Sequence, residues 1–254
     1  MLKTRVIPTL LWKDHGLVKG TGFDSWRRVG PVMPAIKVYN LREVDELIIV
    51  DIRATLDGRE PDYTEIAAFS RESSVPTTVG GGISDVSHIR NLLLAGADKV
   101  AVNSAIYADP ELVSRAASRF GSQCVVVSID FKTAPDGRAE CYSHSGSRAM
   151  GRDPVEWARF MEEKGAGEIL LTSVDRDGTM TGYDLEITRR VSDAVNIPVI
   201  ASGGAGSYED MYQALHTGHA SAVAAASIFH FTELTPLGVK KHLASKGVPV
   251  RKAL

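Results

Sequence analysis

The sequence predicts one (β/α)₈ TIM barrel made of two similar half-barrels, and three observations carry this prediction. Eight short apolar runs alternate with amphipathic stretches from end to end, each run is nearly continuous in apolar character, and the first half of the chain recurs in the second. A length of 254 residues suits a single barrel, and 44% apolar residues can fill a sizeable core.

The eight runs are predicted to be parallel strands, because continuous Val- and Ile-rich character is typical of strands covered on both faces. In chain order they are residues 5–11, 46–52, 75–79, 99–103, 124–130, 168–172, 199–202 and 221–225. Helical patterns, such as residues 110–119 and 154–164, lie between them. Eight strands with intervening helices favour a closed barrel over a sandwich.

Four pairs of segments repeat in the same order, two of them at an offset of 122 residues and the other two at slightly different offsets. They are Leu10-Leu-Trp-Lys with Ile129-Asp-Phe-Lys, Glu46-Leu-Ile-Ile-Val-Asp with Glu168-Ile-Leu-Leu-Thr-Ser, Val75-Pro-Thr-Thr-Val-Gly-Gly-Gly with Ile197-Pro-Val-Ile-Ala-Ser-Gly-Gly, and Val102-Asn-Ser-Ala-Ile with Ala225-Ala-Ser-Ile-Phe. This order predicts half-barrels over approximately residues 1–122 and 123–254, with no linker inside the domain.

Two glycine segments follow predicted strands and precede helical stretches, which predicts a site for two phosphate groups. Glycine lets backbone N–H groups approach an anion, and a following helix adds partial positive charge. A later strand end with small residues accompanies each segment. The predicted phosphate-binding residues are Gly81, Gly82, Asn103 and Ser104 in the first half, and Gly203, Gly204, Ala226 and Ser227 in the second. The alternative for each glycine segment is a tight turn.

Polar residues at other strand ends are predicted to line the mouth of the barrel, where such folds place their sites. Asp130 ends the predicted fifth strand and could act as a general acid or base, with a structural or capping role as the alternative. Lys19, Asp51, Thr172 and Asp177 are the other candidates, although Asp177 could simply form a turn with the glycine after it.

Four charged residues of mixed sign stand at or near strand starts, at the opposite face of the predicted barrel. They are Arg5, Glu46, Lys99 and Glu168. Solvated strand ends or stabilising ion pairs are the ordinary explanation, and a ring that closes the base is the alternative.

Composition excludes several classes of function. A net charge of −2 gives no broad basic face for nucleic acid. The two cysteines show neither a disulfide framework nor metal-ligand spacing, so we expect no metal, no cofactor and a reducing cytoplasm. Residues 1–8 lack the apolar segment of a signal peptide, and no apolar run is long enough to span a membrane.

Six motifs in order resemble the HisF family, the cyclase subunit of imidazole-glycerol-phosphate synthase, over almost the whole chain. They are Val79-Gly-Gly-Gly-Ile, Gly96-Ala-Asp-Lys-Val, Phe120-Gly-Ser-Gln-Cys, Gly167-Glu-Ile-Leu-Leu-Thr-Ser, Asp175-Arg-Asp-Gly-Thr and Ile200-Ala-Ser-Gly-Gly-Ala-Gly. The resemblance implies that a HisH-type glutaminase releases ammonia, which enters the barrel base and travels through the core to the mouth. It also implies a substrate with a phosphate at each end.

The resemblance gives roles to the residues at the base and reveals one departure. Arg5, Glu46, Lys99 and Glu168 match the family's charged ammonia gate, and Asp98 matches the position where the glutaminase docks. The family's cyclase uses two aspartates, of which the second matches Asp130 and the first falls on Leu11. Leucine cannot exchange a proton, and loss of one acid or base typically costs roughly 10²–10⁴-fold in rate. Trp12 and Arg53 are expected to reshape the mouth further.

Two stretches resemble a branch of the family that belongs to surface-polysaccharide pathways, where acetamido sugars become acetamidino sugars. They are Leu10-Leu-Trp-Lys-Asp-His-Gly-Leu-Val-Lys and Lys37-Val-Tyr-Asn-Leu-Arg-Glu-Val-Asp-Glu-Leu-Ile. This resemblance implies an ammonia conduit that works with the glutaminase and an ATP-using sugar amidotransferase. The alternatives are a histidine-pathway cyclase that tolerates Leu11 and a non-catalytic scaffold that activates the glutaminase.

Overall fold

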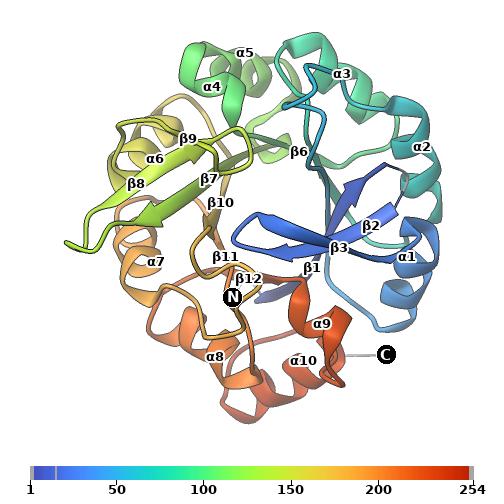
Figure 1. Ribbon diagram of the computed structural model, residues 1–254, viewed down its shortest axis with the longest axis vertical. Helices are drawn as coiled ribbons and strands as arrows, with labels where there is room; N and C mark the ends of the chain where they lie inside the picture. Colours follow the sequence, from blue (N-terminus) through green and yellow to red (C-terminus); the bar gives the residue numbers. More distant parts are fainter. Residues whose placement is uncertain (1–2, 15, 252–254) are drawn as a thin grey trace.

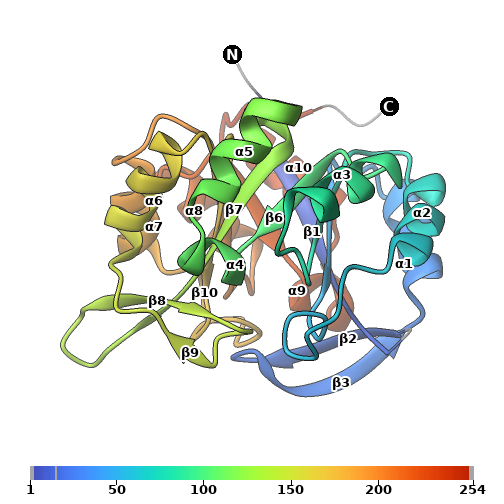
Figure 2. The ribbon, with the colours of Figure 1, turned by 90° about the horizontal axis from the view of Figure 1, so that it is seen from above.

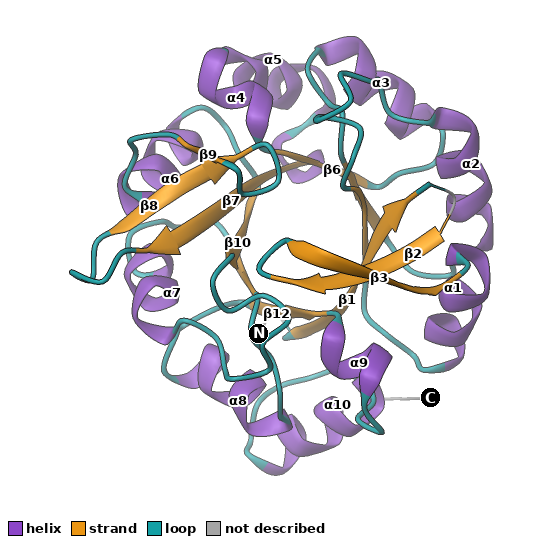
Figure 3. Ribbon diagram, viewed as in Figure 1, coloured by secondary structure: helices purple, strands orange, loops and turns teal. Residues whose placement is uncertain are grey.

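A computed structural model describes residues 3–14 and 16–251 and shows a closed eight-stranded parallel barrel inside a ring of helices (Figures 1 and 3). Around the barrel the strands are β1 (Arg5–Lys13), β4 (Leu47–Asp51), β5 (Thr77–Gly80), β6 (Lys99–Val102), β7 (Val125–Thr133), β10 (Glu168–Ser173), β11 (Val199–Ser202) and β12 (Ala222–Ala225). The last strand, β12, pairs in parallel with β1 and closes the sheet. The predicted TIM barrel is confirmed.

Six of the ten described α-helices begin at a polar residue that satisfies one or more of the first backbone N–H groups. Side chains of Asp62, Asp85, Asp153, Asp184, Ser207 and Thr235 accept such hydrogen bonds at six helix starts. The helices are α1 (Val32–Leu41), α2 (Tyr63–Glu72), α3 (Val86–Leu94), α4 (Ser104–Ala108), α5 (Glu111–Phe120), α6 (Pro154–Glu163), α7 (Leu185–Ser192), α8 (Tyr208–His216), α9 (Ser227–Phe231) and α10 (Pro236–Ser245). A short 3₁₀ helix, η1 (Ser122–Cys124), precedes β7.

Four antiparallel strands extend the barrel on its mouth side, and the sequence analysis missed them. They are β2 (Gly16–Thr21) and β3 (Asp24–Gly30) after β1, and β8 (Ala139–Ser143) and β9 (Arg148–Ala149) after β7. Figure 2 shows both extensions on one face of the molecule. Their sequences are short or polar and lack the longer apolar runs that revealed the barrel strands. As a consequence, Leu11 and Asp130 lie within long strands and not at strand ends.

The order of elements in residues 5–120 recurs in residues 125–245. In each part a nine-residue strand leads into two antiparallel strands, and three helix–strand units follow. Each part then ends with a five-residue helix and a ten-residue helix. This order is the one that two related half-barrels would have.

The core has two parts, one inside the barrel and one between the strands and the helices. Inside, the apolar side chains are Ile7, Ile48, Ala101, Val126, Leu170, Ile200, Ala222 and Ala224. Trp12 belongs to the outer part, because successive side chains of a strand point to opposite faces. Its ring packs edge-on against Phe69 of α2, with centroids 5.4 Å apart. The expectation that Trp12 reshapes the mouth is therefore wrong.

A buried ion pair fastens the last helix to the base of the barrel. Lys240 of α10 donates to Asp45 Oδ1 at 2.7 Å and to the Glu43 carbonyl at 2.5 Å. Asp45 Oδ2 in turn accepts from the Val6 N–H at 2.9 Å. Both side chains of the pair are about 5% exposed or less, so each is the other's main counter-charge.

Replacing Lys240 by Ala should lower the free energy of unfolding by about 3–5 kcal/mol, because it leaves Asp45 buried without its cation. Urea unfolding at pH 7 measures the loss. Lys246→Ala is the matched control, since Lys246 forms an ion pair with Glu209 at 3.3 Å on the surface. Its removal should lower the free energy of unfolding by less than about 1 kcal/mol. Equal losses for the two variants would contradict the assignment.

Candidate functional site

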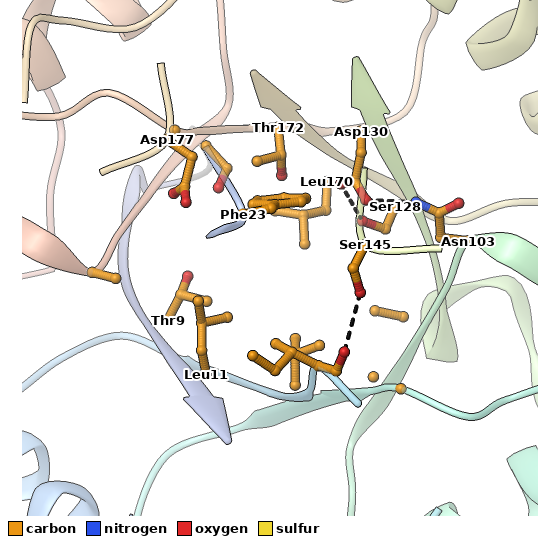
Figure 4. A pocket seen from close by; sticks show the side chains of 18 of the residues that line it. Thr9, Leu11, Phe23, Asn103, Ser128, Asp130, Ser145, Leu170, Thr172 and Asp177 are labelled. Carbon is orange, nitrogen blue, oxygen red and sulfur yellow. Dashed lines mark hydrogen bonds between the residues drawn. The ribbon is translucent and has the colours of Figure 1, made fainter. Parts of the chain in front are cut away.

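One pocket at the C-terminal ends of the barrel strands contains every predicted phosphate-binding and mouth-lining residue in its wall (Figure 4). These are Lys19, Asp51, Gly81, Gly82, Asn103, Ser104, Asp130, Thr172, Asp177, Gly203, Gly204, Ala226 and Ser227. The wall also includes residues that the sequence analysis did not identify, among them Thr9, Phe23, Trp26, Ser128, Ser145 and Leu170. They come from strand interiors and from the two extensions, and of these six only Leu170 falls within a quoted motif, where it stands as an ordinary apolar strand residue.

The first cradle, formed by Gly81, Gly82, Asn103 and Ser104, needs glycine at both glycine positions. Gly81 and Gly82 have φ angles of +105° and +71°. A Cβ on Gly81 would lie 2.2 Å from the Asp51 carbonyl oxygen, and one on Gly82 would lie 2.6 Å from that of Arg59. The backbone itself therefore forms this part of the pocket wall, next to Ser104 at the start of α4.

The second cradle, formed by Gly203, Gly204, Ala226 and Ser227, has the same construction. Gly203 and Gly204 have φ angles of +87° and +109°. Ala226 (φ −127°, ψ −67°) and Asn103 (φ −132°, ψ −81°) share an uncommon backbone conformation before their helices. The Ser227 hydroxyl is buried and has no hydrogen-bond partner within the described structure. Two such cradles suit a ligand with an anionic group at each end.

Asp130 is placed to exchange a proton near neutral pH. It is 9% exposed, and Asn103 Nδ2 donates to its Oδ2 at 2.7 Å. Burial raises the pKa of Asp130 to about 7, the negative charge of Asp177 adds to this, and hydrogen bonds from Asn103 and Ser128 oppose it. Both protonation states are thus accessible, as a general acid or base requires.

Lys19 and Asp177 form a buried ion pair that ties the first extension to the loop after β10. Lys19 is 1% exposed, and its Nζ lies 2.6 Å from Asp177 Oδ2. Burial raises the pKa of Asp177, and the Lys19 charge opposes that shift. The Gly22 N–H also donates to the Asp177 carbonyl at 2.8 Å. The pair therefore holds the β2–β3 hairpin over the mouth.

Asp51 organises the loop after β4 through backbone contacts. Its Oδ1 accepts from the N–H groups of Arg53 and Ala54 at 2.9 and 3.0 Å, and Arg59 lies 3.3 Å from its Oδ2. The Arg53 side chain pairs with Asp57, is 41% exposed and is not in the pocket wall. The expectation that Arg53 alters the mouth is therefore also wrong.

Leu11 lies across the pocket from Asp130, as Figure 4 shows. The carboxylates in the pocket wall of the described structure are Asp51, Asp130 and Asp177. Asp51 already accepts hydrogen bonds from backbone N–H groups, and Asp177 is already paired with the Lys19 ammonium group. Asp130 thus faces an isobutyl group where a second acid or base would stand.

At the opposite end, Arg5, Glu46, Lys99 and Glu168 form a closed ring of ion pairs. Arg5 lies 2.9 Å from Glu46 and also contacts Glu168, and Lys99 lies 3.1 and 3.0 Å from the same two carboxylates. Asp98 is exposed beside Lys99 at the start of β6, and its Oδ2 accepts from the Thr77 N–H at 2.8 Å. The four charges therefore meet at the base, and Asp98 lies on the same face.

No group of three or more His, Cys, Asp or Glu side chains in residues 3–14 and 16–251 could hold a metal ion. None of the helices in this part of the chain is long and apolar enough to cross a membrane.

A comparison with known protein families identifies the family of this chain. The model of the histidine biosynthesis protein family matches residues 5–235, which include all eight barrel strands and both cradles. The chain belongs to this family. Its members are TIM-barrel proteins of the HisA and HisF type.

Asp130→Asn should increase the free energy of unfolding progressively between pH 4 and pH 7, relative to the unaltered protein. Unfolded Asp130 ionises near pH 3.8 and folded Asp130 near 7, so the folded state binds the extra proton in this window. The stability of the unaltered protein therefore falls as pH rises, whereas asparagine has no proton to lose. Urea unfolding in pH steps measures the difference. A difference that does not change with pH would contradict the raised pKa.

Proposed function

We propose that this protein is the synthase-side subunit of a glutamine amidotransferase complex. It receives ammonia from a HisH-type glutaminase and carries it through the barrel for amidination of an acetamido sugar in surface-polysaccharide biosynthesis. One observation carries the proposal: the ring at the base and both cradles at the mouth are present, while Leu11 stands opposite Asp130. Membership of the family supports a glutaminase partner in general terms.

The short distance between the ring and the pocket supports passage through the barrel. On β6 the pocket wall reaches Ala101, and on β10 it reaches Leu170. Each is two residues beyond a ring residue, Lys99 or Glu168, which is about 7 Å along a strand. Small side chains on other barrel strands, such as Ser128 of β7 and Ala224 of β12, continue the pocket wall. Only a thin apolar layer thus separates the ring from the pocket.

The environment of Leu11 supports delivery over ring formation. Leu11 pairs in register with Val50 of β4 and Val18 of β2, so its neighbours on both adjoining strands are apolar. A cyclisation with two proton transfers needs a second group opposite Asp130, and neither Asp51 nor Asp177 is free to serve. Ammonia delivery needs no such group. We place the acceptor on an ATP-using sugar amidotransferase beyond the mouth.

A working histidine-pathway cyclase is the second candidate, and the paired cradles favour it, because they suit a substrate with two phosphate ends. Asp130, with a pKa of about 7, would then act as both acid and base. The two candidates differ in one measurable property, which is turnover of the ribulosyl intermediate of histidine biosynthesis.

Purified protein fed with ammonium salts should give negligible cyclisation of that intermediate, because Leu11 leaves Asp130 without a second acid or base on the opposite side of the pocket. Leu11→Asp should restore a trace of activity, and Leu11→Asn, of similar size but unable to ionise, should restore none. Stopped assays of imidazole product measure all three proteins. Turnover by the unaltered protein at roughly 1 s⁻¹ or faster, as in ordinary enzymes, would establish the cyclase instead.

Lys99→Ala should reduce amidation driven by glutamine several-fold more than amidation driven by ammonium salts, because it opens the ring and leaves Arg5 to serve both carboxylates. Product formation by the reconstituted complex with each nitrogen source gives the ratio. Lys3→Ala, an exposed cation outside the ring, is the matched control. Equal losses with the two nitrogen sources would show that the ring is only structural.

A further inference from the structure

The β2–β3 hairpin places two cations directly opposite each other. Lys19 of β2 pairs in register with Arg27 of β3. Like charges in directly opposed positions of a hairpin repel each other unless each has a partner elsewhere. Lys19 has Asp177 at 2.6 Å, in the loop after β10. The hairpin therefore needs a separate contact for Arg27.

The contact of Arg27 is the ring of Phe231. The guanidinium carbon lies 3.5 Å from the ring centroid, which is a close cation–π stack. Phe231 is the last residue of α9, so the hairpin that follows β1 is fastened to the last part of the barrel. Both cations of the hairpin thus contact elements from the second half of the chain.

Helix α9 connects this contact to the second cradle. It has five residues, starts at Ser227 and ends at Phe231. Next to Phe231, at the same end of the helix, His230 Nδ1 lies 3.4 Å from Tyr39 Oη of α1. Only about 6 Å of helix axis separates Phe231 from Ser227, whose hydroxyl is buried and has no hydrogen-bond partner among the described residues. A shift of Phe231 is therefore expected to reach Ser227.

We propose that Arg27 is a positioning residue for the second cradle. It holds α9 against the hairpin through Phe231 and so fixes Ser227 beside Gly203 and Gly204 in the pocket wall. Arg27 acts through the aromatic ring, and the first cradle, on β5 and β6, does not depend on it. The inference rests on anion binding in the proposed function, and it does not depend on ammonia transfer.

Titration with inorganic phosphate, followed by NMR, tests the inference. Amide shifts of Gly204 and Ser227 report on the second cradle, and those of Gly82 and Ser104 report on the first. Arg27→Ala should weaken phosphate binding at the second cradle by roughly three- to thirtyfold, the range of one cation–π contact, and at the first by less than about twofold. Arg27→Lys, which keeps a cation over the ring, should weaken phosphate binding at the second cradle less than Arg27→Ala does.

Arg28→Ala is the matched control, because Arg28 is the next residue of β3, is also exposed, and stacks on no aromatic ring of the described structure. It should leave both cradles unchanged. Phe231→Leu should reproduce the Arg27→Ala effect, since both substitutions remove the same contact. For the same reason, the double variant should bind phosphate at the second cradle no more weakly than the weaker-binding of the two single variants.

Three results would overturn the inference. They are an Arg27→Ala protein with unchanged binding at the second cradle, equal weakening at both cradles, or additive effects of Arg27→Ala and Phe231→Leu. Absence of phosphate binding at both cradles in the unaltered protein would also remove the anion sites of the proposed function. In contrast, the expected phosphate pattern together with failure of ammonia delivery would remove only the delivery role.

Discussion

Closure of the parallel sheet through β1 is the constraint on which the rest of the structure depends. Because β1 pairs with both β12 and β4, all eight strands present their C-terminal ends at one face and their starts at the other. Residues more than a hundred positions apart, such as Asp51 and Asp177, therefore share one pocket wall. The same closure brings Arg5, Glu46, Lys99 and Glu168 together at the base, where each cation contacts both carboxylates.

The two ends of the barrel carry different chemistry, and the proposed function needs both. The base has a ring of two cations and two carboxylates, and an apolar layer lies behind it. The mouth has two backbone cradles and one carboxylate that can gain or lose a proton near neutral pH. With Leu11 opposite that carboxylate, binding groups are retained without the second acid or base that cyclisation requires. The ammonia delivery that we propose needs only the groups that remain.

The sequence was sufficient for the barrel and for the glycine segments and polar strand ends of the pocket wall, but not for its other members or for the contacts that hold them. Apolar runs marked the eight strands because parallel strands are buried on both faces. The hairpin strands β2 and β3 were not predicted, because β2 has only two adjacent apolar residues and β3 is polar and mostly exposed. The pocket residues Phe23 and Trp26 of this hairpin were missed with them. Trp12 was placed at the mouth wrongly because strand alternation points it outward, and Arg53 because Asp57 draws it to the surface. The Lys240–Asp45 pair depends on packing of α10 that no local pattern reveals.

Passage of ammonia through the barrel interior is the central claim, and an isotope competition tests it most directly. The complex of this protein with its glutaminase and the sugar amidotransferase would be given glutamine labelled with ¹⁵N in the amide, together with a large excess of unlabelled ammonium in solution. A closed route from the ring to the mouth predicts that the amidino nitrogen of the product keeps the ¹⁵N label almost undiluted. Dilution of the label in proportion to the external ammonium would show that the nitrogen passes through solvent, and it would contradict the proposed conduit.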